Sequence, residues 1–324
     1  MCRAVRPPQH NLSTLPTHPI NPKQRAAFST RSILLVALVL GAAAALAAFS
    51  FKRSPASQPI PSTPRIVSLS PAIAITLRDL GLSHLIVGRD AYDRILPASV
   101  PVCGDLTGID YEHLLAVHPT HIFLQLGAKQ IPGRLTELAA RDHWIVRDFP
   151  QLSLDDITSV TRDLQQLLAP GTSSPLFDEM KRAWSRRAEG FGSAGRILLL
   201  AAIDPPSALG PGSCHQQILE RIGAAPAITD GAPYITLDAE DLLKLKPDGI
   251  ILILPRDPGT PAATATPDDL LRLLGRVGQL DLPAVRNSRL ALIDDPLAHT
   301  PSTAMIGVAD QIAAILERWN TPPR

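Results

Sequence analysis

The sequence predicts an α/β protein with two lobes of similar construction, because one phrase occurs twice in it, at residues 112–124 and 240–252. Each copy begins with a Glu that follows an Asp by two positions, and Asp110 and Asp238 are therefore typical helix N-caps. A Leu pair comes next, and a proline then ends the short helix before a β-branched and leucine-rich run. A helix followed by a buried strand, repeated in this way, is typical of a sheet packed on both faces.

Size and composition fit two domains and exclude one class of partner. The chain has 324 residues with 45% hydrophobic content, which is enough to bury a large core. Its formal net charge is +1, and no basic stripe with interleaved aromatic residues occurs in it. Because nucleic-acid binding depends on such a stripe, we expect no nucleic-acid partner.

The amino-terminal region carries a membrane signal. Residues 33–51 are apolar apart from Ser50, and as a helix they are long enough to cross the hydrocarbon of a bilayer. Five Lys or Arg residues precede this stretch, against Lys52 and Arg53 just after it. This bias predicts a cytoplasmic tail at residues 1–32 and an exported remainder.

A cleavable signal peptide is the alternative, because the Ala-Leu-Ala at residues 45–47 resembles a processing site. The long tail before the apolar stretch favours an uncleaved anchor. Residues 52–64 then form a proline-dense linker, which stays extended and would hold the globular part away from the membrane.

The cysteines do not indicate a disulfide framework. Cys2 would lie on the opposite side of the membrane from Cys103 and Cys214, which could pair only if the lobes bring them together. We expect each of them to be a small buried apolar residue, and we predict no cofactor.

The first lobe is predicted at residues 65–151, where strands alternate with helices. The expected strands are 65–69, 85–88, 122–126 and 144–147, and the expected helices are 72–80 and 133–141. Strands that alternate with helices in this way are expected to pair in parallel.

Two helices are predicted to join the lobes, within residues 152–192. Apolar residues recur at helical spacing over 154–168 and 175–191, with a break at Pro170 and Gly171. The second lobe, residues 193–324, should contain strands at 196–200 and 290–293, a turn-rich segment at 204–212, and helices at 213–222 and 303–319.

Between residues 65 and 319 the sequence resembles the substrate-binding proteins of iron-chelate and cobalamin ABC importers, and its motifs are most similar to those of the cobalamin-binding members. The motifs that carry the resemblance are residues 65–71, 80–82, 87–88 with Tyr92, the two repeated phrases, 210–213 with Leu219 and Gly223, and 282–287. The resemblance implies two Rossmann-like lobes with central parallel sheets, a long helix joining them, and a ligand cleft between them. It also implies that no reaction is catalysed.

In the family that the sequence resembles, one exposed glutamate on each lobe docks against arginines of the importer's permease. Glu112 and Glu240 are the matching positions in this chain. Two rigid charges at a fixed separation set register and orientation on a complementary surface. The alternative is that each Glu only favours the positive end of its helix dipole, which is worth about 0.3 to 1 kcal/mol.

Loops that follow strand ends should face each other across the cleft and contact the ligand. The candidate ligand-binding residues are Ser70, Pro71, Tyr92, Leu106, Gln125, Pro205, Ser207 and Tyr234. The two tyrosines match positions of aromatic ligand contacts in cobalamin-binding relatives, and a tyrosine ring suits a macrocycle or planar chelate. Three of the other positions are aromatic in those relatives and are Leu, Gln and Ser here, which leaves cobalamin-like and iron-siderophore or haem-like ligands open.

Catalysis and metal binding have weak signals. Cys214 and His215 stand at the start of a helix beside the cleft and are the two residues best placed to contact a ligand's metal. Ser213 has no recognisable His or Asp partner for nucleophilic catalysis. We therefore predict a membrane-anchored, exported binding protein that delivers a metal chelate to an importer. The alternative is a bilobal signalling or scaffold module that is tethered to the membrane and has lost transport.

Overall fold

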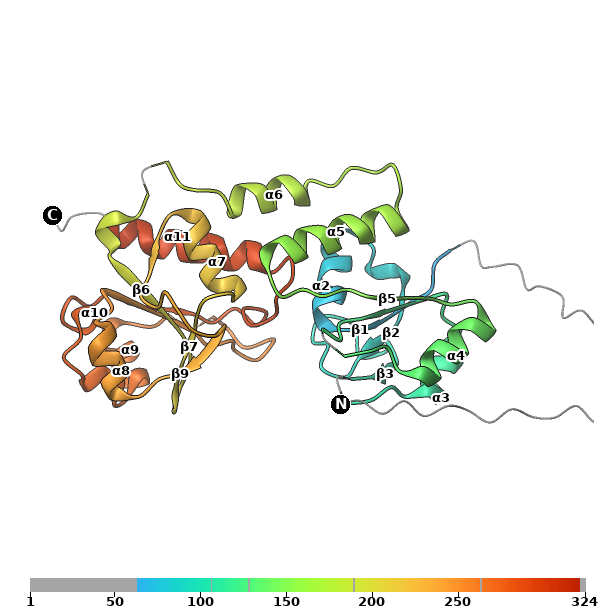
Figure 1. Ribbon diagram of the computed structural model, residues 1–324, viewed down its shortest axis with the longest axis horizontal. Helices are drawn as coiled ribbons and strands as arrows, with labels where there is room; N and C mark the ends of the chain where they lie inside the picture. Colours follow the sequence, from blue (N-terminus) through green and yellow to red (C-terminus); the bar gives the residue numbers. More distant parts are fainter. Residues whose placement is uncertain (1–62, 106, 128, 189, 263, 321–324) are drawn as a thin grey trace, which may run out of the picture. The chain divides into compact units, whose positions relative to one another are not determined.

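The first lobe is built on a five-stranded parallel sheet with helices on both faces (Figure 1). The computed structural model describes residues 63–320 apart from 106, 128, 189 and 263. The strands are β1 (Ile66–Leu69), β2 (Ile86–Asp90), β3 (Val102–Gly104), β4 (His121–Leu124) and β5 (Ile145–Asp148). They lie in the order β3-β2-β1-β4-β5, so the order reverses between β1 and β4.

The helices of the first lobe bury one apolar cluster on each face of its sheet. They are α2 (Pro71–Asp79), η1 (Ser83–Leu85), α3 (Tyr111–Ala116) and α4 (Gly133–Asp142). Side chains of α2 pack with Ile66 and Phe123 on one face, while Leu114 of α3 and Leu135 of α4 pack with Val67 on the other. Asp110 caps α3 by accepting hydrogen bonds from the backbone N–H groups of Glu112 and His113, which confirms the predicted N-cap.

The second lobe contains a six-stranded mixed sheet, in the order β11-β10-β6-β7-β9 with β8 beside β6. The strands are β6 (Arg196–Ile203), β7 (Pro206–Leu209), β8 (Ala225–Pro226), β9 (Tyr234–Thr236), β10 (Gly249–Ile253) and β11 (Leu290–Ile293). The implied parallel sheet is present, because β10 pairs parallel with β6 and β11, but β7 departs from it by pairing antiparallel with both β6 and β9. The turn-rich segment 204–212 contains β7. Its prolines are typical of turns and therefore concealed the strand, but the first residue of a strand is a position where proline is tolerated.

Helices cover both faces of the second sheet (Figure 1). They are α7 (Cys214–Ile222), α8 (Ala239–Leu245), α9 (Pro267–Leu274), η3 (Val277–Gln279), α10 (Pro283–Arg286) and α11 (Met305–Asn320). Apolar residues of α7 and α11 pack on one face, and those of α8, α9 and α10 pack on the other. Asp238 caps α8 in a capping box with Asp241, which confirms the second predicted N-cap.

The helix α5 (Leu154–Leu168), predicted with the same bounds, contributes to the cores of both lobes. Leu154 and Ile157 in its first turns belong to the apolar cluster of the second lobe. Val160 and Leu164, one to two turns later, belong to a cluster of the first lobe. Burial of one aliphatic side chain stabilises a fold by about 1.5–3 kcal/mol. The apolar contacts that α5 makes with both cores therefore hold the lobes together, in addition to the covalent connection that it provides.

The second predicted connecting helix is shorter than expected. The structure has α6 (Leu176–Ala183) followed by an irregular segment and η2 (Gly192–Ala194), so the prediction of one helix over 175–191 was wrong. Trp184 and Phe191, which suggested helical spacing, are both buried, and the Trp184 Nε1–H donates to the carbonyl oxygen of Met305 at 3.4 Å. In the segment after α6, the spacing of the apolar residues therefore indicated that they are buried, but it did not indicate that the backbone is helical.

The predicted membrane span at residues 33–51 and most of the predicted linker lie outside the described residues. Within residues 63–320, none of the helices combines the length and the hydropathy needed to cross a bilayer. All described elements belong to one compact unit, Pro61–Arg324.

Candidate functional site

Two of the predicted ligand-binding residues meet where the strand order of the first sheet reverses. Ser70 follows β1 and Gln125 follows the neighbouring β4, and the Ser70 hydroxyl donates a hydrogen bond to Gln125 Oε1 at 2.6 Å. Ser70 also caps α2 by accepting from the N–H of Ile73, and Pro71 occupies the first turn of that helix. In open α/β sheets, ligands bind outside the carboxyl ends of the strands at such a reversal.

Tyr92 is presented at the same edge of the sheet by a buried carboxylate. Asp90 ends β2 and is fully buried, and its Oδ1 accepts from the Tyr92 N–H at 2.8 Å. Burial raises the pKa of Asp90, and this outweighs the opposing effect of that hydrogen bond. The Tyr92 side chain is left 61% exposed, as a ligand contact requires. Leu106, predicted to lie nearby, falls outside the described residues.

The second-lobe candidates lie along the β6–β7 hairpin and its neighbour β9. Pro205 is in the hairpin turn, and Ser207 lies within β7, where it is buried and donates its hydroxyl to the carbonyl oxygen of Pro205 at 3.2 Å. Tyr234 begins β9, pairs with Leu209 and is 55% exposed. Tyr234 therefore lies beside the last residue of β7, whereas the hairpin turn that holds Pro205 precedes the first residue of that strand.

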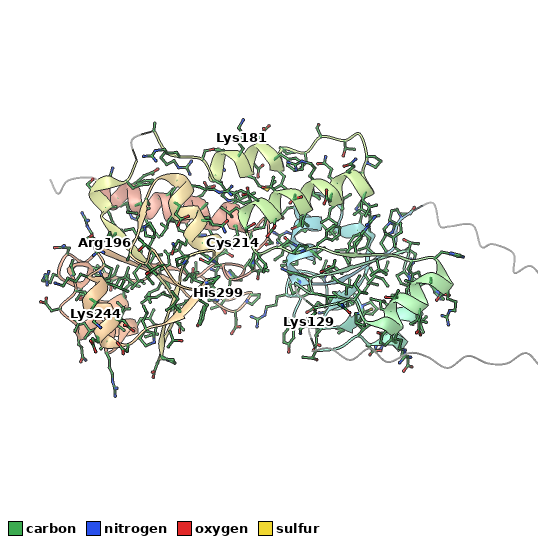
Figure 2. All side chains as sticks on the ribbon, in the orientation of Figure 1. Lys129, Lys181, Arg196, Cys214, Lys244 and His299 are labelled. Atoms are coloured by element: carbon green, nitrogen blue, oxygen red, sulfur yellow. The ribbon has the colours of Figure 1, made fainter. Side chains whose placement is uncertain are left out.

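Glu112 and Glu240 occupy equivalent places in the two lobes, in the first turns of α3 and α8. Both side chains are exposed. Glu240 forms an ion pair at 2.7 Å with Lys244, one helical turn along α8. Lys244 is labelled in Figure 2. An exposed pair of this kind stabilises a helix by only about 0.3–0.5 kcal/mol, so it does not prevent Glu240 from changing partners.

Cys214, which is labelled in Figure 2, and His215 are buried and already hydrogen-bonded at the start of α7. The Cys214 thiol donates to the carbonyl oxygen of Leu152 at 3.2 Å, and His215 Nε2 donates to the carbonyl oxygen of Ala298 at 2.6 Å. Among the residues that the structure describes, no three His, Cys, Asp or Glu side chains are grouped so that they could hold a metal ion.

The buried position of His215 lowers its pKa to about 4, because burial penalises the imidazolium form. The ring of His299 stands edge-on to it with 6.3 Å between centroids, and His299 Nε2 donates to the carbonyl oxygen of Ile253 at 2.8 Å. Residues 214, 215, 216, 218, 219 and 222 of α7 are buried, and the apolar ones among them recur at helical spacing. This periodicity is the sequence signal that could have placed His215 in the core.

Cys103 and Cys214 should be unreactive in the folded protein. Burial raises the pKa of the Cys103 thiol to about 11 and that of Cys214 to about 12, and only the thiolate is strongly nucleophilic. In a Cys2→Ser variant of the full chain, we expect no labelling by a thiol-reactive chromogenic disulfide at pH 7.5 until denaturant is added. Rapid labelling of the folded variant would contradict the buried placement of both thiols.

Two polar side-chain contacts between described residues join the lobes directly. Arg94, in the loop after β2, forms an ion pair with Asp257, in the loop after β10, at 3.2 Å. The Thr303 hydroxyl, just before α11, donates to Asp79 Oδ2 at the end of α2 at 2.5 Å. Neither pair could be predicted from the sequence, because their members are far apart along the chain.

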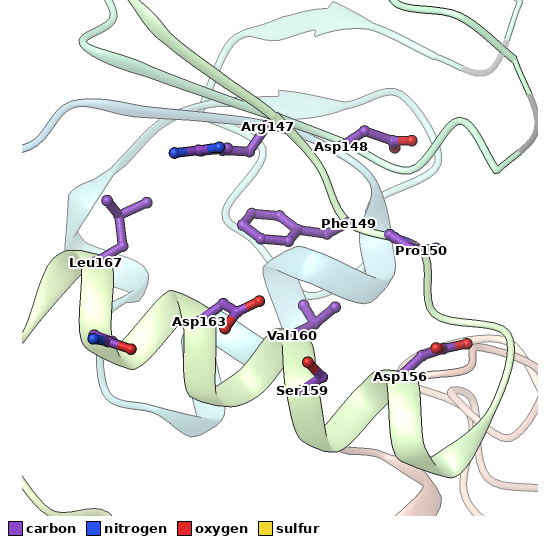
Figure 3. Close-up of a pocket in the computed structure, with 10 residues that line it drawn as sticks. Arg147, Asp148, Phe149, Pro150, Asp156, Ser159, Val160, Asp163 and Leu167 are labelled. Carbon is purple, nitrogen blue, oxygen red and sulfur yellow. The ribbon is translucent and has the colours of Figure 1, made fainter.

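A hollow of about 620 Å³ that the sequence did not reveal lies in the first lobe, between α5 and the end of β5 (Figure 3). Asp148 lines the hollow and also contacts the predicted ligand-binding loops, since its Oδ1 accepts from the N–H of Leu126 at 2.7 Å. The hollow is therefore adjacent to the candidate site but is formed by a different set of residues.

No protein-family model matches the chain, and no curated protein matches it. Among solved structures, the periplasmic heme-binding protein HutB of Vibrio cholerae matches with a TM-score of 0.62 and 18% identity, covering 78% of this chain and 98% of that one. The periplasmic heme-binding protein RhuT from Roseiflexus sp. RS-1 matches with a TM-score of 0.59 and 21% identity, covering 80% and 100%. The periplasmic vitamin B12 binding protein BtuF of Vibrio cholerae matches with a TM-score of 0.54 and 17% identity, covering 80% and 98%. The described residues therefore have the fold of periplasmic binding proteins.

Proposed function

We propose that this protein is an extracytoplasmic substrate-binding protein that captures a metal chelate and delivers it to an ABC importer, held at the membrane through residues 33–51. The chelate is cobalamin-like, siderophore-like or haem-like. In this role the protein binds and releases its ligand without transforming it. Glu112 and Glu240 are the proposed contacts with the importer's permease.

The observation that carries this proposal is the pairing of Ser70 with Gln125 at the strand-order reversal, in a fold shared with binding proteins for such ligands. Exposed Tyr92 lies at the same edge of the sheet and offers a flat apolar ring with a polar tip. A polar pair beside an aromatic face suits a ligand that is a large, flat ring system with polar substituents.

The test is to purify the full chain from an exporting host and to record the absorbance spectrum and native mass of any ligand that accompanies it. Unfolding temperatures are then measured with added cyanocobalamin, haem or a ferric hydroxamate. A ligand present at about 100 times its Kd should stabilise the native state by about 2.7 kcal/mol and raise the Tm. Absence of a saturable shift with all three would contradict the proposal and favour a scaffold role.

The predicted tyrosine contacts are tested with the chelate that binds. We expect Tyr92→Ala and Tyr234→Ala each to weaken binding by about three- to ten-fold, because each removes an aromatic contact. Leu273→Ala removes an exposed apolar side chain of α9, outside the predicted loops, and should leave the Kd unchanged. If all three variants bind the chelate with the same Kd as the parent chain, neither tyrosine contacts the ligand.

A further inference from the structure

The hollow beside α5 has the size and lining of a binding site that is separate from the predicted chelate site. Its volume of about 620 Å³ lies within the range of small-molecule pockets, about 300–1,000 Å³. One wall is the end of β5 with the following residues Phe149 and Pro150, and the other is a single face of α5 (Figure 3). β5 is the edge strand of its sheet, so no further strand among the described residues covers this side.

The floor of the hollow is apolar and fixed in place. Phe149 is 7% exposed and stands edge-on against Phe123, with ring centroids 5.4 Å apart and planes at 71°. Val160 of α5 is 4% exposed, and both residues belong to the core cluster of the first lobe. A ligand with an apolar body would therefore meet a preformed surface, without having to order these side chains.

Two opposite charges face the hollow without partners. Arg147 on β5 and Asp163 on α5 are both exposed, and neither side chain forms a hydrogen bond or an ion pair with another described residue. Figure 3 shows Arg147 on the strand side and Asp163 on the helix side, with the ring of Phe149 between them in this view.

The other two carboxylates of the lining are already engaged. Asp148 Oδ1 accepts from the N–H of Leu126, while Asp156 Oδ2 accepts from the N–H groups of Leu152 and Ser153 as part of the α5 capping box. Arg147 and Asp163 are therefore the charged side chains of the hollow that have no hydrogen bond or ion pair to another described residue.

We propose that this hollow binds a small zwitterion whose carboxylate meets Arg147, whose ammonium meets Asp163, and whose apolar middle lies on Phe149 and Val160. A guanidinium fork binds a carboxylate through two parallel hydrogen bonds, and a carboxylate accepts readily from an ammonium. A ligand with a single charge would leave one of the two protein charges without a partner. This site is independent of the proposed chelate binding.

The probes for the test are 6-aminohexanoate, which carries both charges on an apolar chain, and hexanoate and hexylammonium, which carry one charge each. Binding to the full chain is followed by ligand-observed NMR titration at low ionic strength. We expect saturable binding of 6-aminohexanoate, and at least about five-fold weaker binding of either singly charged probe, since an exposed ion pair is worth up to about 1 kcal/mol.

Variants locate the binding in the hollow. Arg147→Gln and Asp163→Asn should each weaken 6-aminohexanoate binding by about five-fold. Arg162→Gln is the matched control, because Arg162 is an exposed residue of the same helix that does not line the hollow, and it should bind as the parent chain does. The exchange Arg147→Asp with Asp163→Arg should restore part of the lost affinity, because the zwitterion can then bind in the reverse direction.

The proposal is overturned if 6-aminohexanoate does not saturate, if the singly charged probes bind equally well, or if Arg147→Gln and Asp163→Asn bind as Arg162→Gln does. The chelate titrations described above are run on the same variants. Unchanged chelate affinity in Arg147→Gln would show two separate sites. Failure of every chelate to bind would count against the proposed function but would leave the zwitterion result standing.

Discussion

Reversing both proposed docking charges, with Glu112→Lys and Glu240→Lys, should abolish uptake of the chelate while leaving its Kd for the purified protein unchanged. Both side chains are exposed, and neither lies in the predicted ligand-binding loops. Charges at the rim of an interface guide encounter and fix register, and like charges brought face to face cost several kcal/mol. Uptake is measured with radiolabelled chelate in cells that have no other route for its import.

The matched control distinguishes docking from a helix-dipole effect. Glu179 and Asp268 are also exposed acids in first helical turns, those of α6 and α9. Glu179→Lys with Asp268→Lys removes similar dipole interactions and should leave uptake intact. Uptake that survives reversal of Glu112 and Glu240, or that is lost equally in the control, would refute the docking role.

Acid should destabilise the folded protein through His215. Its pKa is about 4 in the folded chain, against about 6.5 for an ordinary histidine, so the unfolded chain binds more protons between these two values. The contribution of His215 to the free energy of unfolding should therefore be constant above pH 6.5, and it should fall as the pH is lowered toward 4. The loss attributable to His215 approaches about 3 kcal/mol, since one pKa unit corresponds to about 1.36 kcal/mol.

Chemical denaturation at a series of pH values measures this effect. His215→Gln keeps an N–H group that can donate to the carbonyl oxygen of Ala298 but cannot titrate, so its stability should fall much less between pH 6.5 and 4. Some slope should remain, because burial also lowers the pKa of His299. His84→Gln, at an exposed histidine, should follow the parent chain. Parallel curves for His215→Gln and the parent chain would contradict the prediction.

The elements that could be predicted are those whose ends carry local chemistry. The bounds of α5 were predicted correctly because its apolar residues recur at helical spacing and a proline and a glycine follow it. The repeated phrase identified α3 with β4 and α8 with β10 for the same reason. The antiparallel β7 was missed because its pairing depends on β6 and β9, and turn residues surround it in the sequence.

The candidate site shows the same division. Sequence reasoning chose Ser70 and Gln125 as loop residues after neighbouring strands, but their hydrogen bond depends on a strand order that local patterns do not encode. Arg147 and Asp163 were missed because each is an ordinary surface charge in the sequence. They face one hollow only once β5 and α5 have packed against the same lobe.

The packing of α5 into two cores has a consequence for how the molecule melts. If one half lost its structure, the helix would be stripped of partners along half of its length, and the apolar side chains exposed there would penalise the half-melted species. Intermediates with a single intact half should therefore be sparsely populated, so that heat or denaturant removes both halves in one cooperative step.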